Sequence, residues 1–197
     1  MIKWGIVGLG NMANHFANAI KELDNAKLIS VASKSKIKLK NFVKNHNISD
    51  DCSFNSYNDL IESNSINSVY ISTLNNTHGE LIRECVKNKK NILCEKPIGL
   101  NIEEAKLAHD KLKNVRIFFN EAIAYRSHPQ TIELINLIDA NEIGEIKKID
   151  TSFGFKVQKI NKDSRLFNKS LGGGAILDVG CYPVSFFNLF VDKKDKL

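Results

Sequence analysis

A glycine-rich turn near the start of the chain constrains the fold more than any other feature. The short apolar run 2–7 leads directly into residues 8–13, Gly-Leu-Gly-Asn-Met-Ala, which fit the pattern G-x-G-x-x-A. Between a strand and a helix, this pattern turns backbone N–H groups and the positive helix end toward a pyrophosphate. Gly8 permits the tight turn, Gly10 lets the phosphate approach, and Ala13 lets helix and strand pack closely. A turn without a ligand is the alternative, but we expect Gly8, Gly10, Asn11 and Met12 to bind a dinucleotide.

The hydrophobic pattern alternates between short β-rich runs and amphipathic helices, which predicts an α/β fold with a Rossmann, doubly wound parallel sheet. Several of the runs are almost wholly apolar, as strands buried on both faces are. We expect strands at 2–7, 27–32, 52–54, 69–72, 91–94 and 115–119, and helices at 12–23, 36–45, 78–88 and 101–113. Asn101, followed by acidic residues, is a good start for the last of these helices.

The pattern changes after Phe119, so we predict two domains, one over residues 1–120 and a partial one over 121–197. In the second region we expect a helix at 129–140, a long strand at 145–155, an irregular polar loop at 156–171, an apolar helix at 175–190 and a charged tail. One strand and one helix cannot bury two faces of a sheet. We therefore predict an incomplete α+β domain.

Charge and cysteine spacing exclude several classes of protein. The net charge of +6 comes from 28 Lys and Arg against 22 Asp and Glu, and the basic residues are scattered without an aromatic platform. This pattern does not favour a nucleic-acid partner, but it allows a mild preference for anionic ligands. The cysteines have no C-x-x-C spacing, so we expect reduced thiols and no local metal site. With no leader segment and no apolar run that could span a membrane, we expect a cytoplasmic protein without a membrane partner.

The end of the second predicted strand bears on the choice of cofactor. NAD-selective folds place an acidic residue there, on the ribose hydroxyls, but this chain has Ser33, Lys34 and Ser35. A Lys and two hydroxyls suit the extra 2′-phosphate of NADP. We expect NADP, with NAD as the alternative, and the competing interpretation of Lys34 is a solvated side chain at a helix start.

Lys96 and Tyr182 are candidates for acid–base chemistry. Lys96 follows the fifth predicted strand, at the sheet edge where ligands of such folds bind. Asp178 and Tyr182 are four residues apart, so a helix would place them on one face. A neighbouring ammonium would stabilise the phenolate of Tyr182, and Lys96 could supply it. The alternatives are a surface Lys in a proline turn and a core Tyr with a satisfied hydroxyl.

Taken together, these segments resemble the Gfo/Idh/MocA oxidoreductase family over essentially the whole chain. The resemblance is carried, in the family's order, by residues 8–13, 69–73 (VYIST) with Asn75 and His78, 95–97 (EKP), 121–130 (EAIAYRSHPQ) and 172–183 (GGGAILDVGCYP). The pattern is most similar to the branch containing dimeric dihydrodiol dehydrogenase, NADP-dependent xylose dehydrogenase and glucose-fructose oxidoreductase. Inositol dehydrogenases of the family have His where Tyr182 stands.

The resemblance implies an NAD(P)-dependent dehydrogenase of sugars, polyols or dihydrodiol-type hydroxyl compounds, and a homodimer for a full-length parent protein. Its second domain would be a large, mostly antiparallel sheet. The implied catalytic roles are substrate orientation by Lys96, general acid–base catalysis by Tyr182 and substrate binding by Asp178. The remaining implied residues line the cofactor or substrate cleft: Thr73, Asn75, His78 and Glu95 on one side and Arg165 on the other.

Two departures from the family pattern stand out. Leu74 occupies the position after Thr73 where the family usually has Pro, and the sequence stops soon after the Tyr182 helix. Most of the second-domain sheet is therefore missing from the sequence. A truncated, non-catalytic NADP-binding module is the competing functional hypothesis.

Overall fold

The structure, a computed structural model, describes residues 1–113 and 115–191. The chain divides into two compact units, Met1–Ala122 and Ile123–Leu197. The charged tail expected at the end of the chain lies outside the described residues.

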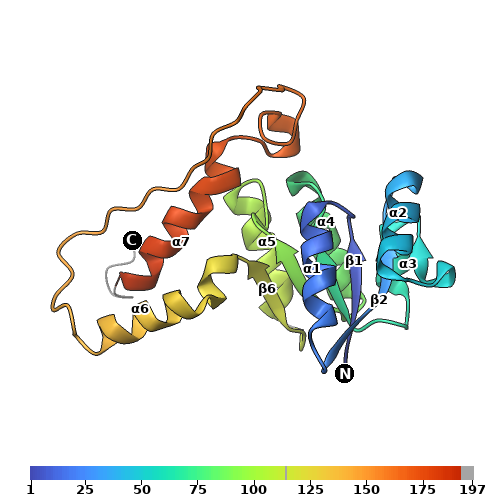
Figure 1. Cartoon of the computed structure of the whole chain (residues 1–197), viewed down its shortest axis with the longest axis horizontal. Coiled ribbons are helices and arrows are strands. Elements are labelled where there is room, and N and C mark those ends of the chain that lie inside the picture. Colours follow the sequence, from blue (N-terminus) through green and yellow to red (C-terminus); the bar gives the residue numbers. More distant parts are fainter. Residues whose placement is uncertain (114, 192–197) are drawn as a thin grey trace. The chain divides into compact units, whose positions relative to one another are not determined.

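The first unit is a six-stranded parallel sheet in the order β3-β2-β1-β4-β5-β6. Figure 1 shows β1 beside β2, with β6 on the other side of β1. Its strands are β1 Ile2–Val7, β2 Ala26–Ala32, β3 Ser53–Phe54, β4 Ser68–Ile71, β5 Asn91–Glu95 and β6 Phe119–Ala122. This is the order of the doubly wound dinucleotide-binding fold, in which the chain starts at the centre and the crossovers run outward in both directions. The predicted fold class is confirmed for this unit.

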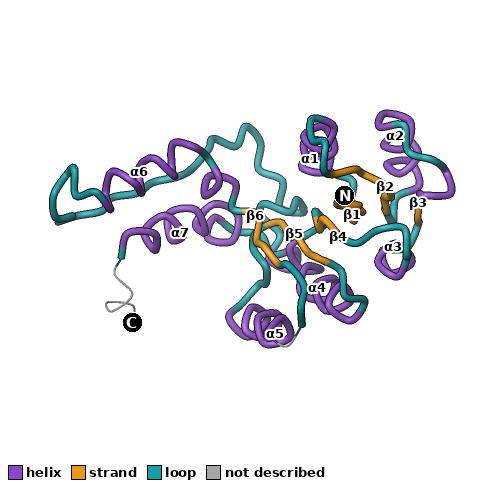
Figure 2. Tube along the Cα trace, turned by 90° about the horizontal axis from the view of Figure 1, so that it is seen from below, coloured by secondary structure: helices purple, strands orange, loops and turns teal. Residues whose placement is uncertain are grey.

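Helices cover both faces of the sheet (Figure 2). The helices are α1 Asn11–Lys21, α2 Lys36–His46, α3 Tyr57–Glu62, α4 His78–Lys87 and α5 Ile102–Lys113. Because successive strand residues point to opposite faces, Ile6 enters the core layer with α1 and α2, and Val7 enters the layer with α3, α4 and α5. Every residue of β4 is buried.

The helix starts follow from local side-chain chemistry. The hydroxyl of Ser35 caps α2 and that of Ser56 caps α3. The Asn101 Oδ1 accepts a hydrogen bond from the Glu104 N–H at 2.9 Å, and the Glu104 carboxylate accepts one from the Leu100 N–H, also at 2.9 Å. These bonds satisfy N–H groups that a helix start leaves without partners. The predicted start of α5 is confirmed.

Two predictions for the first unit were wrong in detail. The last strand was expected at residues 115–119, but β6 begins at Phe119, where its pairing with Ile92 of β5 begins. The short helix α3, only six residues long, was not predicted. A helix of fewer than two turns shows too little periodicity to be recognised in the sequence.

The described part of the second unit contains helices and turns but no strand. Its main helices are α6 Pro129–Asp139 and α7 Cys181–Phe190, and a π-helical turn, Ile176–Gly180, comes directly before α7. The strand predicted at residues 145–155 is absent, because a strand needs a neighbour to pair with and no other strand lies in this part of the unit. The helix predicted at 175–190 is divided between the π turn and α7.

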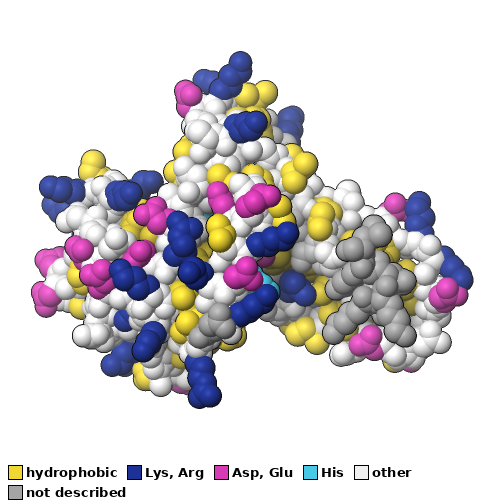
Figure 3. All heavy atoms as spheres, turned by 180° about the vertical axis from the view of Figure 1, so that it is seen from behind, with side chains coloured by type: hydrophobic (Ala, Val, Ile, Leu, Met, Phe, Trp, Pro, Cys, Tyr) yellow, Lys and Arg dark blue, Asp and Glu magenta, His cyan; other side chains and the backbone are white. Residues whose placement is uncertain are grey.

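Charged side chains are mixed on the surface. On the face shown in Figure 3, Lys and Arg side chains are interspersed with Asp and Glu rather than gathered into one basic area. Among the described residues, no helix has the length and apolar character that a membrane crossing requires.

Core packing predicts that two apolar substitutions have very different effects on the free energy of unfolding. Leu60 is fully buried in α3, whereas Ile37 in α2 is 75% exposed. We expect Leu60→Ala to lower the free energy of unfolding by about 2–5 kcal/mol, because it leaves a cavity in the core. The control Ile37→Ala should change it by less than about 0.5 kcal/mol. Urea unfolding of both variants checks this, and equal losses would contradict the packing described here.

Candidate functional site

The glycine turn lies at the carboxyl edge of the sheet, between β1 and α1. Gly8 has φ +87°, and a Cβ at this position would lie 2.7 Å from Thr73 Cγ2 and 2.8 Å from the Ser72 carbonyl oxygen. The Ser72 hydroxyl donates a hydrogen bond to the Gly8 carbonyl oxygen at 2.6 Å. Both the backbone conformation and the close approach of β4 therefore require glycine.

Gly10 has a different role, because the space beside it is open. It is the N-cap residue of α1, with an extended backbone and without a side-chain cap. A Cβ on Gly10 would meet no atom within 4 Å. Asn11 and Met12 follow in the exposed first turn of α1, and Ala13 is fully buried against the sheet. An uncapped helix start beside open space fits a pyrophosphate, since its N–H groups and positive end are directed outward.

Ser33 and Lys34 follow β2 at the same edge. Ser33 is buried, and its Oγ accepts a hydrogen bond from the Ser35 N–H at 3.2 Å, so its hydroxyl shapes the turn. Lys34 is exposed, and its ammonium lies 5.4 Å from the centre of the Tyr57 ring, within range of a cation–π interaction. Burial raises the pKa of Tyr57, and the backbone N–H of Lys34 opposes this shift.

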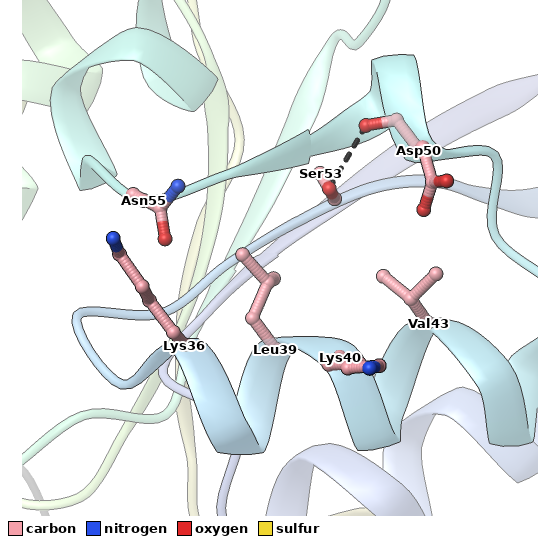
Figure 4. A pocket seen from close by; sticks show the side chains of 7 residues that line it. All are labelled: Lys36, Leu39, Lys40, Val43, Asp50, Ser53 and Asn55. Carbon is pink, nitrogen blue, oxygen red and sulfur yellow. Dashed lines mark hydrogen bonds between the residues drawn. The ribbon is translucent and has the colours of Figure 1, made fainter.

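A pocket of about 320 Å³ lies between α2 and β3, next to this turn (Figure 4). It is lined by Lys36, Leu39, Lys40, Val43, Asp50, Ser53 and Asn55. Figure 4 shows the side chains of Lys36 and Asn55 at the same end of the pocket, while the Ser53 hydroxyl donates to the Asp50 carbonyl oxygen at the other end. Lys36 and Asn55 were not predicted as site residues, because their proximity depends on how α2 packs beside β3.

The polar loop after β4 carries the next predicted residues. Thr73 accepts a hydrogen bond from the Thr77 hydroxyl at 2.7 Å, and Asn75 lies in the short 3-10 turn between them. His78 begins α4 and has no exposed surface. Its Nδ1 lies 2.7 Å from the Pro97 carbonyl oxygen and its Nε2 lies 3.3 Å from that of Thr73. His78 can therefore act on a ligand only through these two loops.

The segment after β5 contains Glu95, Lys96 and Pro97, all at the carboxyl edge. The Tyr70 hydroxyl donates a hydrogen bond to Glu95 Oε1, and the Lys96–Pro97 peptide bond is cis. Burial raises the pKa of the Tyr70 phenol and that of the Cys94 thiol. Lys96 is partly buried. The first unit thus brings the glycine turn, the Thr73 loop and the Lys96 segment to one edge of one sheet.

The second unit holds the other predicted residues around the π turn. Asp178, in that turn, is 8% exposed, and the Arg165 Nη1 donates a hydrogen bond to its Oδ1 at 2.8 Å. Tyr182 lies in the first turn of α7, and its ring centre lies 4.9 Å from that of Phe153. The structure therefore joins Asp178 and Arg165, which were predicted as separate ligands. Lys96 and Tyr182 belong to different units, so their pairing remains a prediction.

Within residues 1–113 and 115–191, no group of three or more His, Cys, Asp or Glu side chains is placed to hold a metal ion. Burial raises the pKa of the Cys85 thiol to about 12, which disfavours the reactive thiolate form.

The strand order, the glycine turn and the polar residues at the carboxyl edge define a dinucleotide-binding Rossmann domain. Residues 2–119 match the Gfo/Idh/MocA model described as "Oxidoreductase family, NAD-binding Rossmann fold", and residues 131–196 match the Gfo/Idh/MocA C-terminal domain. The chain belongs to the Gfo/Idh/MocA oxidoreductase family, as its sequence blocks predicted.

Several characterised proteins are similar to this chain. Trans-1,2-dihydrobenzene-1,2-diol dehydrogenase of Xenopus tropicalis is 33% identical over 189 residues, which are 95% of this chain and 56% of that protein. D-xylose 1-dehydrogenase (NADP(+)) 2 of Haloferax volcanii is 29% identical over 185 residues, covering 94% and 52%. The chain spans about half the length of the curated relatives it matches.

Solved structures support the same fold. The crystal structure of aldose-aldose oxidoreductase from Caulobacter crescentus aligns with a TM-score of 0.87 at 21% identity, over 95% of this chain and 57% of that one. The structure of scyllo-inositol dehydrogenase from Lactobacillus casei with bound NAD(H) and scyllo-inositol aligns with a TM-score of 0.69 at 26% identity, over 74% of this chain and 43% of that one.

The two glycines of the turn give a matched pair of substitutions. Gly8→Ala should lower stability, because its Cβ would collide with Thr73 and Ser72 at positive φ. Gly10→Ala should leave stability unchanged but weaken NADPH binding by ~10-fold or more, because its methyl group would fill the space left for the pyrophosphate. Thermal unfolding and a fluorescence titration check both effects. Unchanged NADPH affinity in Gly10→Ala would argue against a pyrophosphate at this turn.

Proposed function

We propose that this chain is the nucleotide-binding and catalytic portion of an NAD(P)-dependent oxidoreductase acting on CH–OH groups. Its substrate class is a sugar, a polyol or a dihydrodiol-type compound. Two of the similar proteins, the dihydrodiol dehydrogenase and the xylose dehydrogenase, are named for substrates of this kind. The observation that carries the proposal is the open, uncapped turn at Gly10 on the same sheet edge as Lys96.

NADP is the proposed cofactor, with NAD as the alternative. Residues 33–36 contain no acid that could bind the ribose 2′-hydroxyl, and Lys34 supplies a cation next to the end of β2. The lining of the pocket beside this turn adds two further cations, Lys36 and Lys40, and one carboxylate, Asp50. A phosphate monoester carries a charge that such cations attract, whereas a free hydroxyl does not. The Lys34 ammonium lies 5.4 Å from the centre of the Tyr57 ring, within range of a weak cation–π attraction.

The chemistry divides between the cofactor and the protein. The nicotinamide, when bound, supplies or accepts the hydride at its C4. Lys96 binds the substrate oxygen through its ammonium and orients the carbon that exchanges the hydride. The Tyr182 hydroxyl gives a proton to that oxygen in reduction and takes it back in oxidation. Asp178, held by Arg165, binds a neighbouring substrate hydroxyl.

Three further expectations from the sequence belong to this proposal. They are the division into a cofactor-binding domain and a partial substrate domain, a homodimer for a full-length parent protein, and a cytoplasmic location.

Removing the ammonium of Lys96 tests the proposed chemistry. We expect Lys96→Met to lower turnover of the best substrate from a panel of aldoses, polyols and diols by ~10²-fold or more, with NADPH affinity nearly unchanged. Lys106→Met, an exposed Lys on α5, is the matched control and should behave like the parent chain. Near-normal turnover in Lys96→Met would remove Lys96 from the mechanism.

Tyr182→Phe should give a similar loss of turnover, because it removes the proton donor and keeps the ring that packs near Phe153. NADPH binding by the parent chain without turnover of any substrate in the panel would favour the competing hypothesis, a non-catalytic NADP-binding module. Turnover with Tyr182→Phe at the parent rate would show that the proton comes from another group.

A charge reversal at Lys34 tests cofactor choice. Lys34→Asp should shift the ratio of NADPH to NADH affinity toward NADH, because the carboxylate repels the 2′-phosphate and accepts hydrogen bonds from ribose hydroxyls. Lys44→Asp, in the last turn of α2, makes the same change of charge at the other end of that helix and should leave the ratio unchanged. An unaltered ratio in Lys34→Asp would show that Lys34 does not contact the cofactor.

A further inference from the structure

The segment that carries Lys96 is fixed by hydrogen bonds on both sides of that residue. Before Lys96, the Tyr70 hydroxyl donates to the Glu95 carboxylate. After Lys96, the Pro97 carbonyl oxygen lies 2.7 Å from His78 Nδ1, and the Ile98 N–H donates to Glu121 Oε1 at 3.1 Å. Two of these three contacts come from β4 and α4, the elements on either side of the Thr73 loop.

The packing of the Tyr70 ring positions its hydroxyl for the hydrogen bond to Glu95. Its side chain is 2% exposed, and its ring stacks on Phe16 of α1 with centres 4.0 Å apart. The packed ring therefore fixes the position of its hydroxyl. Because burial and the Glu95 carboxylate both raise the pKa of Tyr70, the phenol stays protonated and remains a donor at any physiological pH. A hydrogen bond from a neutral hydroxyl to a carboxylate is stronger than one between neutral groups, and it is strengthened by burial.

His78 holds the other side of Lys96. A neutral imidazole has one N–H, so it can donate to only one of the two carbonyl oxygens that face its ring. The shorter contact, at 2.7 Å, assigns the proton to Nδ1 and the hydrogen bond to Pro97. Burial lowers the pKa of His78, against smaller opposing effects of the two carbonyl oxygens and Glu95, while Lys96 also lowers it. The net lowering of this pKa favours the neutral ring.

We infer that Tyr70 and His78 are positioning residues that hold the Lys96 backbone through its two neighbours in the chain, and so direct the Lys96 ammonium at the substrate oxygen. The role of the ammonium rests on the proposed function, whereas the holding of the segment does not. Lysine has a long side chain with many rotamers, so its reach is directed only if its Cα is fixed. Displacement of a catalytic group by about 1 Å can cost ~10²-fold in rate.

The test uses Tyr70→Phe, which keeps the buried ring and removes only the hydroxyl. Two His78 variants accompany it: His78→Asn places an amide N–H near the position of Nδ1, and His78→Leu removes every donor. The first readout is backbone hydrogen exchange of residues 95–100 in the chain without cofactor, with the α3 peptide as an internal reference. This readout does not depend on any enzymatic activity.

We expect exchange over residues 95–100 to rise about 10-fold in Tyr70→Phe and His78→Leu, with α3 unchanged and His78→Asn close to the parent chain. Turnover should fall by about 10-fold in the same two variants, with NADPH affinity nearly unchanged, and His78→Asn should restore most of it. Unchanged exchange in Tyr70→Phe would overturn the inference, as would a loss of NADPH affinity without a loss of turnover. If the parent chain lacks turnover, the proposed function fails, while the exchange readout still decides whether these residues hold the segment.

Discussion

The parallel register of β1, β4 and β5 is the constraint on which the rest of the structure depends. Val7 pairs with Ile71, and Ile71 pairs with Cys94, so the chain leaves all three strands at the same edge. This alignment brings the glycine turn, the Thr73 loop and the Lys96 segment together from residues far apart in the sequence. The register is favoured because β4 is buried throughout, Ile6 and Val7 of β1 are buried in opposite core layers, and Ile92 and Cys94 of β5 are buried on one face. A slip of one residue would turn every side chain to the opposite layer.

Buried and partly buried polar groups connect the loops at this edge of the sheet. The Ser72 hydroxyl bonds to the Gly8 carbonyl oxygen, and the His78 ring connects the Thr73 loop to Pro97. Leaving such a group without a partner costs about 1–3 kcal/mol, so each bond favours the arrangement in which the loops are held together. Specific binding and catalysis need this order, since a cofactor and a substrate must meet within about 3–3.5 Å.

Local patterns predicted most of the first unit, and the misses other than α3 share a physical cause, because each depends on contacts between distant parts of the chain. The glycine turn, the apolar strands and the Asn101 cap are signals contained within a few neighbouring residues. The start of β6 depends on pairing with Ile92, and the strand expected at residues 145–155 lacks a partner in the described part of its unit.

The contacts around Lys96 were missed for the same reason. The sequence alone identifies His78 only as a polar residue and Tyr70 only as an aromatic one. Their bonds to Pro97 and Glu95 appear only when β4, β5 and α4 are packed. Family resemblance identified Asp178 and Arg165 separately, but their ion pair is a tertiary contact.

A titration of the chain with NADPH and, separately, with NADH tests the central claim most directly, because it requires no knowledge of the substrate. Trp4 is the single tryptophan, and its ring packs edge-on against Phe16 of α1, the helix whose start forms the proposed pyrophosphate site. Quenching of its fluorescence and the emission of the nicotinamide report binding together. Saturable binding, tighter for NADPH than for NADH, is the predicted result. Absence of binding by both nucleotides in the folded chain would contradict the assignment of the glycine turn as a dinucleotide site.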